Sequence, residues 1–196
     1  MKRFLTLLAL PILLSACVDT TGISAESSRK PQGNAMSVVV ITEFSDLECP
    51  ACRSANMTIV KPLLEKYGTQ VRFDYTHFPL RSLHRHTMEL AEAAECAADQ
   101  GKFTEFVDLA FENQPELAKG KALEWGSTLV SDKDLFTRCV KSKIKDKAIM
   151  SDYDAGVAMG VQGTPSFFVN GKQTDASLEA LSTAIEAQLK GAQMRL

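Results

Sequence analysis

The sequence predicts an α/β protein in which a long helical segment separates two parts that contain strands. Residues 38–78 show a strand, a helix and a second strand, and residues 166–190 show two short strands and a helix. Residues 83–159 contain helical patterns and no convincing strand. A chain of 196 residues is long enough for one domain, or for one domain with an insertion.

The first strand and helix are predicted at residues 38–68. Residues 38–44 form a β-branched apolar run that indicates a buried central strand. From Pro50 onward the pattern becomes helical, and Gly68 ends it. Pro62 predicts a kink within this helix, because proline lacks the backbone N–H. The apolar face consists of Met57, Val60, Leu63 and Leu64.

The second strand and the helical segment follow. Apolar and polar residues alternate from residue 71 to about 78, which predicts a strand. Helices are expected over residues 88–98 and 146–159, and Ser131 is expected to cap another one. A further apolar stripe indicates a helix that faces the core rather than a cofactor. It consists of Phe103, Phe106, Val107, Ala110 and Phe111.

The last part of the chain predicts a hairpin and a final helix. Residues 166–169 form a short strand, and Asn170-Gly171 is a strong signal for a type I′ turn. Lys172 then begins the return strand. Residues 177–190 carry apolar residues at helical spacing.

The N-terminus predicts export. Lys2 and Arg3 precede an apolar run over residues 4–14, which is shorter than the roughly 20 residues that a membrane-spanning helix needs. Residues 1–16 therefore indicate a secretory signal peptide. The string Leu-Ser-Ala-Cys that ends at Cys17 resembles the bacterial lipobox, in which the cysteine becomes the first mature residue and carries a lipid. The alternative is an ordinary leader with an incidental cysteine.

The segment after the leader, residues 17–36, has few apolar residues and is expected to be a flexible tether. The formal charge of the whole chain is −2, and removing Lys2 and Arg3 leaves 20 basic and 24 acidic side chains. This balance gives no indication of nucleic-acid binding.

The chain has five cysteines. Acylation of Cys17 would leave an even number, which in an oxidising compartment favours two disulfides. The close pair, Cys49 and Cys52, would then form the reactive disulfide, and the distant pair, Cys96 and Cys139, the structural disulfide. Two buried free thiols are the alternative for the distant pair.

The motif Cys49-Pro50-Ala51-Cys52 stands at the predicted start of a helix. Unpaired N–H groups and the helix dipole favour the thiolate of Cys49 there. Cys49 is therefore expected to form mixed disulfides and Cys52 to resolve them. A zinc site is disfavoured because it needs four ligands, and no further ligand pair has suitable spacing. We expect no metal and no cofactor.

Glu43 is the second candidate, an acid on an apolar strand six residues before Cys49. Burial would raise its pKa and let it exchange a proton with Cys52. The alternative places Glu43 at the strand end, in water. The Thr164–Pro165 bond would be trans on frequency alone, since about 5–6% of X–Pro bonds are cis.

Four motifs together resemble those of the DsbA-like thioredoxin-fold thiol–disulfide oxidoreductases, in the same order along the chain. They are residues 44–52 with the CPAC sequence, residues 77–80, residues 94–103 and residues 160–171. The resemblance implies a thioredoxin fold with an inserted helical domain. The thioredoxin core would comprise residues 37–81 and 156–196, and the helical insertion residues 82–155.

The resemblance also implies roles for individual residues. Pro165 matches the cis-proline that faces the CxxC motif, and the backbone of Thr164 would pair with an extended substrate. Glu43 falls at the buried acid of the family. Some members carry a second disulfide in the helical domain, where Cys96 and Cys139 lie.

The function that the resemblance implies is a disulfide oxidase for secreted proteins, reoxidised by a quinone-linked membrane partner of the DsbB type. It would be a monomer, lipid-anchored on the periplasmic side of a membrane. The alternatives are a tethered reductase or isomerase and, from another functional class, a thiol-dependent metal-delivery protein or chaperone. Strongly oxidising members have His where this chain has Ala51 and Val where it has Thr164, so the direction of electron flow stays open.

Overall fold

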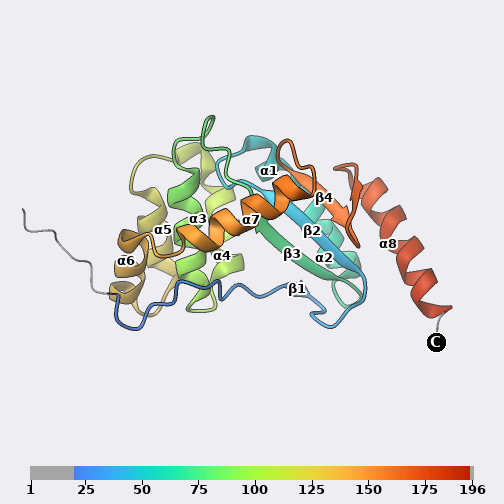
Figure 1. Cartoon of the computed structure of the whole chain (residues 1–196), viewed down its shortest axis with the longest axis horizontal. Helices are drawn as coiled ribbons and strands as arrows, with labels where there is room; N and C mark the ends of the chain where they lie inside the picture. Colours follow the sequence, from blue (N-terminus) through green and yellow to red (C-terminus); the bar gives the residue numbers. More distant parts are fainter. Residues whose placement is uncertain (1–19, 195–196) are drawn as a thin grey trace, which may run out of the picture.

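The structure is a computed structural model and describes residues 20–194. It confirms the α/β architecture: a five-stranded sheet lies beside a group of helices (Figure 1). The strand order is β1-β3-β2-β4-β5, in which β2 and β3 are parallel and the other neighbours are antiparallel. The strands are β1 Gln32–Gly33, β2 Val40–Ser45, β3 Arg72–His77, β4 Ser166–Val169 and β5 Lys172–Thr174. The sequence predicted all of these except β1.

The helices of the first half are α1 Pro50–Ala55, a π-helix Asn56–Val60, α2 Lys61–Tyr67, α3 Thr87–Ala98 and α4 Phe103–Glu112. Those of the second half are a short 3₁₀ helix Gln114–Glu116, α5 Lys121–Leu129, α6 Lys133–Ser142, α7 Asp146–Ala158 and α8 Leu178–Gln193. Helix α5 was not predicted. The expected cap of α6 was wrong by one residue: the side chain of Asp132, not that of Ser131, accepts from the Leu135 N–H at 2.8 Å.

The distortion that Pro62 predicts takes the form of the π-helix directly before α2. The wider turn accommodates a position at which proline cannot donate. It also changes which side chains face the core. Met57, expected on the apolar face, is 51% exposed, whereas Ile59 and Val60 are buried.

Helices cover both faces of the sheet. On one face Ile41 and Phe73 belong to the same buried cluster as Leu63 of α2 and Leu181 of α8. On the other face lies helix α7, which crosses the sheet in Figure 1. The second cluster consists of Phe44, Phe78, Val161 and Phe168, with Tyr153 of α7 packed against it.

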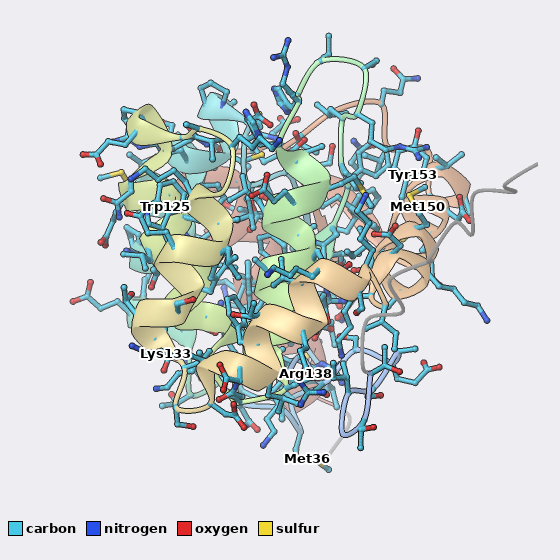
Figure 2. The ribbon with its side chains drawn as sticks, turned by 90° about the vertical axis from the view of Figure 1, so that its left-hand side faces the viewer. Met36, Trp125, Lys133, Arg138, Met150 and Tyr153 are labelled. Carbon is cyan, nitrogen blue, oxygen red and sulfur yellow. A yellow bond between two sulfur atoms is a disulfide. The ribbon has the colours of Figure 1, made fainter. Side chains whose placement is uncertain are left out.

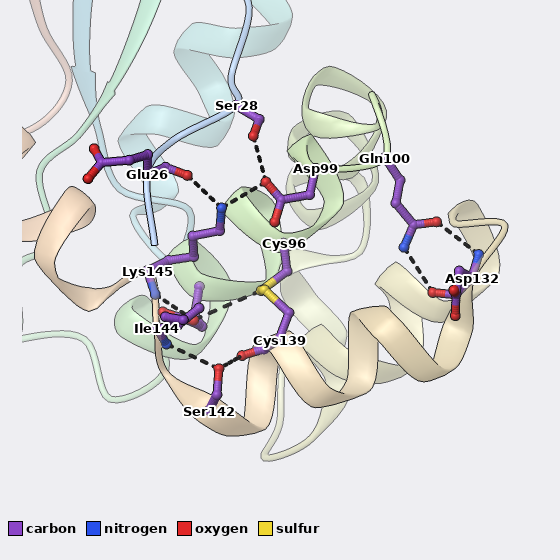
Figure 3. The surroundings of a disulfide bond; sticks show 11 residues. Glu26, Ser28, Cys96, Asp99, Gln100, Asp132, Cys139, Ser142, Ile144 and Lys145 are labelled. Atoms are coloured by element: carbon purple, nitrogen blue, oxygen red, sulfur yellow. Dashed lines mark hydrogen bonds and ion pairs between the residues drawn. A yellow bond between two sulfur atoms is a disulfide. The ribbon is translucent and has the colours of Figure 1, made fainter. Parts of the chain in front are cut away.

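Helix α3 is the centre of the helical region and packs against α4, α5 and α6. Figure 2 views this region from outside, with Trp125 on α5 and Arg138 on α6 labelled. Gly126 permits the close approach of α5 to α6, because a Cβ atom there would lie 2.1 Å from the Phe136 ring. The predicted Cys96–Cys139 disulfide is present and joins α3 to α6 (Figure 3).

Residues 20–31 run along the helical region before they reach β1 (Figure 1). The sequence predicted a flexible tether here, and the structure instead holds these residues by hydrogen bonds and ion pairs. The Lys145 ammonium, which is fully buried, donates to the Glu26 carbonyl and to the Asp99 carboxylate, both at 2.7 Å (Figure 3). Arg29 contacts Glu95 at 2.7 Å and Asp152 at 2.8 Å. We call residues 20–31 the N-terminal strap.

The strap docks because α3 carries a buried acid that needs a cationic partner. Burial alone would raise the pKa of Glu95, but the hydrogen bond and charge of His77 and the charge of Arg29 lower it to about 2. His77 is itself buried and lies 3.2 Å from Glu95. Composition alone could not reveal these partners, because His77 on β3 and Arg29 in the strap are distant from Glu95 in the sequence.

The predicted signal peptide (residues 1–16) and the lipidation residue Cys17 lie outside the described residues. Among the helices of residues 20–194, none combines the length and the hydrophobicity that spanning a membrane requires. The division into a core of residues 37–81 and 156–196 and an insertion of residues 82–155 remains a prediction.

Replacing both cysteines of the helical region, Cys96→Ala with Cys139→Ala, is expected to lower the free energy of unfolding by about 2–4 kcal/mol. The disulfide closes a loop over a sequence separation of 43, which restricts the unfolded chain. Urea unfolding followed by far-UV circular dichroism measures the loss. The control Cys17→Ser, which changes neither of the two cysteine pairs, should show no such loss, and a Cys96→Ala with Cys139→Ala variant as stable as the wild type would contradict the prediction.

Candidate active site

The CxxC motif lies where β2 leads into α1. β2 ends at Ser45, and Cys49 is the N-cap residue of α1 with extended backbone angles, φ −75° and ψ 120°. Pro50 occupies the first helical position, where its missing N–H costs nothing. Cys49 is 7% exposed and Cys52 is fully buried, and the two sulfurs are not bonded to each other. Cys49 is therefore the sulfur that a substrate reaches.

The thiol of Cys49 is acidified by its surroundings. A hydrogen bond from Cys52, the Thr164 hydroxyl, and the backbone N–H groups of Cys52 and Ala51 lower its pKa to about 5, although burial opposes this shift. The Cys49 sulfur also lies 3.5 Å from the Thr164 carbonyl oxygen. At neutral pH Cys49 is a thiolate, the form that attacks disulfides.

Cys52 has the opposite character. Burial, the neighbouring Cys49 and the charge of Glu43 raise its pKa far above the ordinary value. The backbone N–H of Asp46 points to its sulfur at 3.5 Å. Cys52 therefore needs a proton whenever it leaves a disulfide.

Glu43 lies below this pair, as the sequence predicted. It is 1% exposed and is paired in the sheet with Tyr75 on β3 and Phe167 on β4. Burial and the charge of Cys49 raise its pKa to about 8, and the Ser45 hydroxyl opposes the rise. The carboxyl is thus mostly protonated at neutral pH and holds a proton close to Cys52.

The loop before β4 completes the site. The Thr164–Pro165 bond is cis, which agrees with the expectation from the family resemblance and not with the frequency argument. The loop brings Thr164 to Cys49, so that Cys49, Cys52, Glu43, Thr164 and Pro165 form one cluster. The Cys96–Cys139 disulfide lies apart from this cluster, in the helical region.

Asp46 was missed from the sequence. Its carboxylate accepts from Leu80 N and from His84 Nδ1, both at 2.8 Å, and from the Thr87 hydroxyl at 2.7 Å and Glu48 N at 2.9 Å. It thus fixes both the loop before Cys49 and the chain that follows β3. The signal in the sequence that could have revealed its role is the position of this aspartate, directly after a buried strand.

Gln114 was also missed. Its amide donates to the Leu47 and Cys49 carbonyls at 2.9 and 3.1 Å. Gln114 belongs to the 3₁₀ helix after α4, so a residue of the helical region positions the nucleophile. Nothing in the sequence around Gln114 signalled this contact.

Within residues 20–194, potential metal ligands gather in the helical region. Among residues 20–194 the group of potential ligands that lies close together is Glu92, Cys96 and Cys139, and both of its sulfurs are engaged in the disulfide. Cys49 and Cys52 have no such third ligand within the described part of the chain.

Comparison with known proteins identifies the family. The family model described as thioredoxin matches residues 26–187. The chain belongs to the thioredoxin family. Its fold is also that of BdbD from Bacillus subtilis in the oxidised form, with a TM-score of 0.74 and 21% identity over 83% of this chain and 94% of that chain. These findings confirm the thioredoxin fold that the motifs indicated.

Two curated relatives of this thioredoxin-family chain differ in length. A probable disulfide bond formation protein D from Bacillus cereus is 27% identical over 214 residues, which cover 94% of this chain and 97% of that protein. A protein named Na(+)/H(+) antiporter NhaA 3 from Salinispora tropica is 38% identical over 159 residues, which cover 80% of this chain. The chain spans about a quarter of the length of the antiporter-named relatives, 24% in this case.

Glu43→Gln is expected to stabilise the reduced protein at neutral and alkaline pH. The unfolded chain releases the Glu43 proton near pH 4.5, whereas the folded chain keeps it until about pH 8. The wild type therefore loses stability as the pH rises through this window, and the variant gains roughly 1–3 kcal/mol over it above pH 7. Urea unfolding at pH 4, 6 and 8 measures this difference.

The control for this prediction is Glu65→Gln, on the exposed side of α2. It should show no gain that grows with pH. A gain from Glu43→Gln that is equal at pH 4 and pH 8 would mean that the proton on Glu43 does not limit stability.

Cys52→Ala is expected to move the pKa of Cys49 upward from about 5 toward the ordinary thiol value, because the hydrogen bond from Cys52 makes the largest contribution to the shift. Thiolate absorbance at 240 nm against pH measures the midpoint. Thr164→Val removes a smaller contribution and should move it less. A midpoint that stays near 5 in Cys52→Ala would assign the acidity to the helix N-terminus instead.

Proposed function

We propose that this protein is an extracytoplasmic thiol–disulfide oxidoreductase that acts as a disulfide oxidase. The observation that supports this proposal is the asymmetry of the Cys49–Cys52 pair: Cys49, the less deeply buried sulfur, is a stabilised thiolate, and Cys52, which is fully buried, is a weak acid. Stabilising the reduced form makes the disulfide a stronger oxidant. Such a pair tends to transfer its disulfide to the thiols of a substrate.

The reaction takes two exchanges. A substrate thiolate attacks the Cys49 sulfur of the Cys49–Cys52 disulfide, and Cys52 leaves with the electron pair of the broken bond. Glu43 gives its proton to the Cys52 sulfur. A second substrate thiolate then attacks the substrate sulfur of the mixed disulfide, and Cys49 leaves as the thiolate that its surroundings stabilise. The substrate acquires a disulfide, and the protein becomes a dithiol.

The substrates are reduced, extended segments of secreted proteins. The backbone of Thr164, next to the Cys49 sulfur, offers an edge at which such a segment can pair in the manner of an added strand. A shallow hollow of about 470 Å³ continues from this edge. It is lined by Gly160, Gln162, Gly163, Thr164, Pro165, Ser166 and Gln173.

A quinone-linked membrane partner of the DsbB type would restore the disulfide. The proposed signal peptide and the lipid on Cys17 would keep the monomeric protein near that partner, on the periplasmic side of the membrane. The relative named as a probable disulfide bond formation protein, which matches nearly its whole length, favours this activity over that of the antiporter-named relatives.

A tethered reductase or isomerase is the second candidate. Ala51, between the two cysteines, offers no charged or hydrogen-bonding side chain to the Cys49 thiolate, so the reduced form lacks one source of stabilisation. A thiol-dependent metal-delivery protein or chaperone would need tight Cu(I) or Zn(II) binding by the reduced pair.

The deciding measurement is the reduction potential of the Cys49–Cys52 pair, determined by glutathione titration of the mature chain with Cys17→Ser. A potential near −120 mV is expected for an oxidase, and one near −270 mV would make the protein a reductant. Equimolar metal binding without turnover of a dithiol peptide would instead favour metal delivery. The variant Cys17→Ser leaves the redox pair and the Cys96–Cys139 disulfide unchanged.

A further inference from the structure

Two hydroxyl groups below the CxxC motif have no assigned role. Ser45 is fully buried, and Tyr75 is 5% exposed. The Ser45 Oγ and Tyr75 Oη atoms make no hydrogen bond within the described part of the chain, and neither does Glu43 Oε1. Buried polar atoms without partners are uncommon, and each needs an explanation. Here three of them belong to neighbouring positions of β2 and β3.

The register of the sheet brings these groups together. Glu43 on β2 is paired with Tyr75 on β3, and Ser45 follows Glu43 by two residues, so all three project from the same face. Cys52 of α1 packs on this face. The Tyr75 ring is held by edge contacts with His77 at 5.2 Å and Phe103 at 5.4 Å between ring centres. The Tyr75 hydroxyl is therefore fixed in place.

Ser45 is the common neighbour of the three titratable groups. It is fully buried on the same face of the sheet as Glu43 and Tyr75, and its hydroxyl opposes the rise in the pKa of Glu43, of Cys52 and of Tyr75. Burial and the charges of Glu43, Cys52 and Asp46 raise the pKa of Tyr75. Tyr75 thus stays neutral and keeps its proton available for donation.

We infer that Ser45 and Tyr75 are positioning residues that donate hydrogen bonds to the negative charge that forms beneath the CxxC motif during exchange. When Cys52 leaves the disulfide, the charge first lies on its sulfur and, after Glu43 has given up its proton, on the Glu43 carboxylate. Donors fixed in advance stabilise such a charge without reorganising at the moment of reaction. In the resting state the carboxyl is neutral, so the hydroxyl groups have no charged acceptor.

The other groups that face Glu43 do not replace these donors. From α1 it faces Cys49, which ends the reaction as a thiolate, and Cys52, whose thiol holds the proton that Glu43 gave up; from β4 it is paired with Phe167, which is apolar. Asp46 carries a charge of the same sign, and its carboxylate is occupied by other donors. Ser45 and Tyr75 are therefore hydroxyl donors with no other partner that face the Glu43 carboxylate within residues 20–194.

The test measures how fast the oxidised protein reacts with a dithiol peptide, by stopped flow from pH 5 to 9, in Ser45→Ala, Tyr75→Phe and the double variant. Each single change should slow the reaction about tenfold, the effect of one hydrogen bond to a charged group, and the double change should slow it further. The part of the pH–rate profile that reports ionisation of Glu43 should move to higher pH, because the variants lose donors to the Glu43 carboxylate. Ser45→Thr, which keeps a hydroxyl, should restore most of the rate.

Matched controls separate this role from a loss of packing. Tyr67→Phe removes a buried tyrosine hydroxyl that bonds to Glu186 elsewhere, and Thr42→Val removes a hydroxyl from the opposite face of β2. Neither should change the rate or the pH profile. Rates and pH profiles of Ser45→Ala and Tyr75→Phe equal to those of the wild type would overturn the inference, as would an equal slowing by the controls.

This inference rests on thiol–disulfide exchange at Cys49–Cys52, which is part of the proposed function, but it does not depend on the direction of electron flow. If the wild type failed to react with the dithiol peptide, the proposed function would be wrong. If the wild type reacted and the variants matched it, only the role of Ser45 and Tyr75 would be wrong.

Discussion

The chemistry of this protein depends on one difference between two sulfurs that are three residues apart. The start of α1 supplies N–H groups and a hydrogen bond from Cys52 to the Cys49 sulfur, while burial keeps Cys52 protonated. Much of the surrounding structure maintains this difference. Asp46 fixes the loop before the motif, Gln114 holds the carbonyl of Cys49, and the loop at Pro165 presents Thr164.

The same arrangement costs stability. A buried acid with a pKa of about 8 disfavours the folded state at neutral pH, and unpaired hydroxyl groups beside it add to the cost. The helical region offsets this through its disulfide and through the ion pairs of the strap. The site is therefore built for charge that appears during reaction, and stability comes from parts of the molecule away from the site.

The sequence predicted most of the fold because its strong signals are local. The apolar runs, the turn at Asn170-Gly171 and the CxxC motif each lie within a few residues, and Glu43 was found because an acid interrupts an apolar strand. The family resemblance was needed for Pro165, since frequency alone predicted the wrong isomer. Residues that act through distant partners were missed: Gln114, Arg29 and Lys145 are defined by contacts across the chain. Met57 was misplaced because a π-helix changes the helical phase.

The N-terminal strap has a consequence for how the molecule folds. Lys145 binds the Glu26 carbonyl across 119 residues, and Arg29 reaches α7 through Asp152. Such contacts raise the contact order of the chain, and chains rich in distant contacts fold slowly. The strap residues, which are synthesised early, can make these contacts only after α6 and α7 have been synthesised. In an exported chain the strap would therefore stay undocked until Lys145 and Asp152 had crossed the membrane.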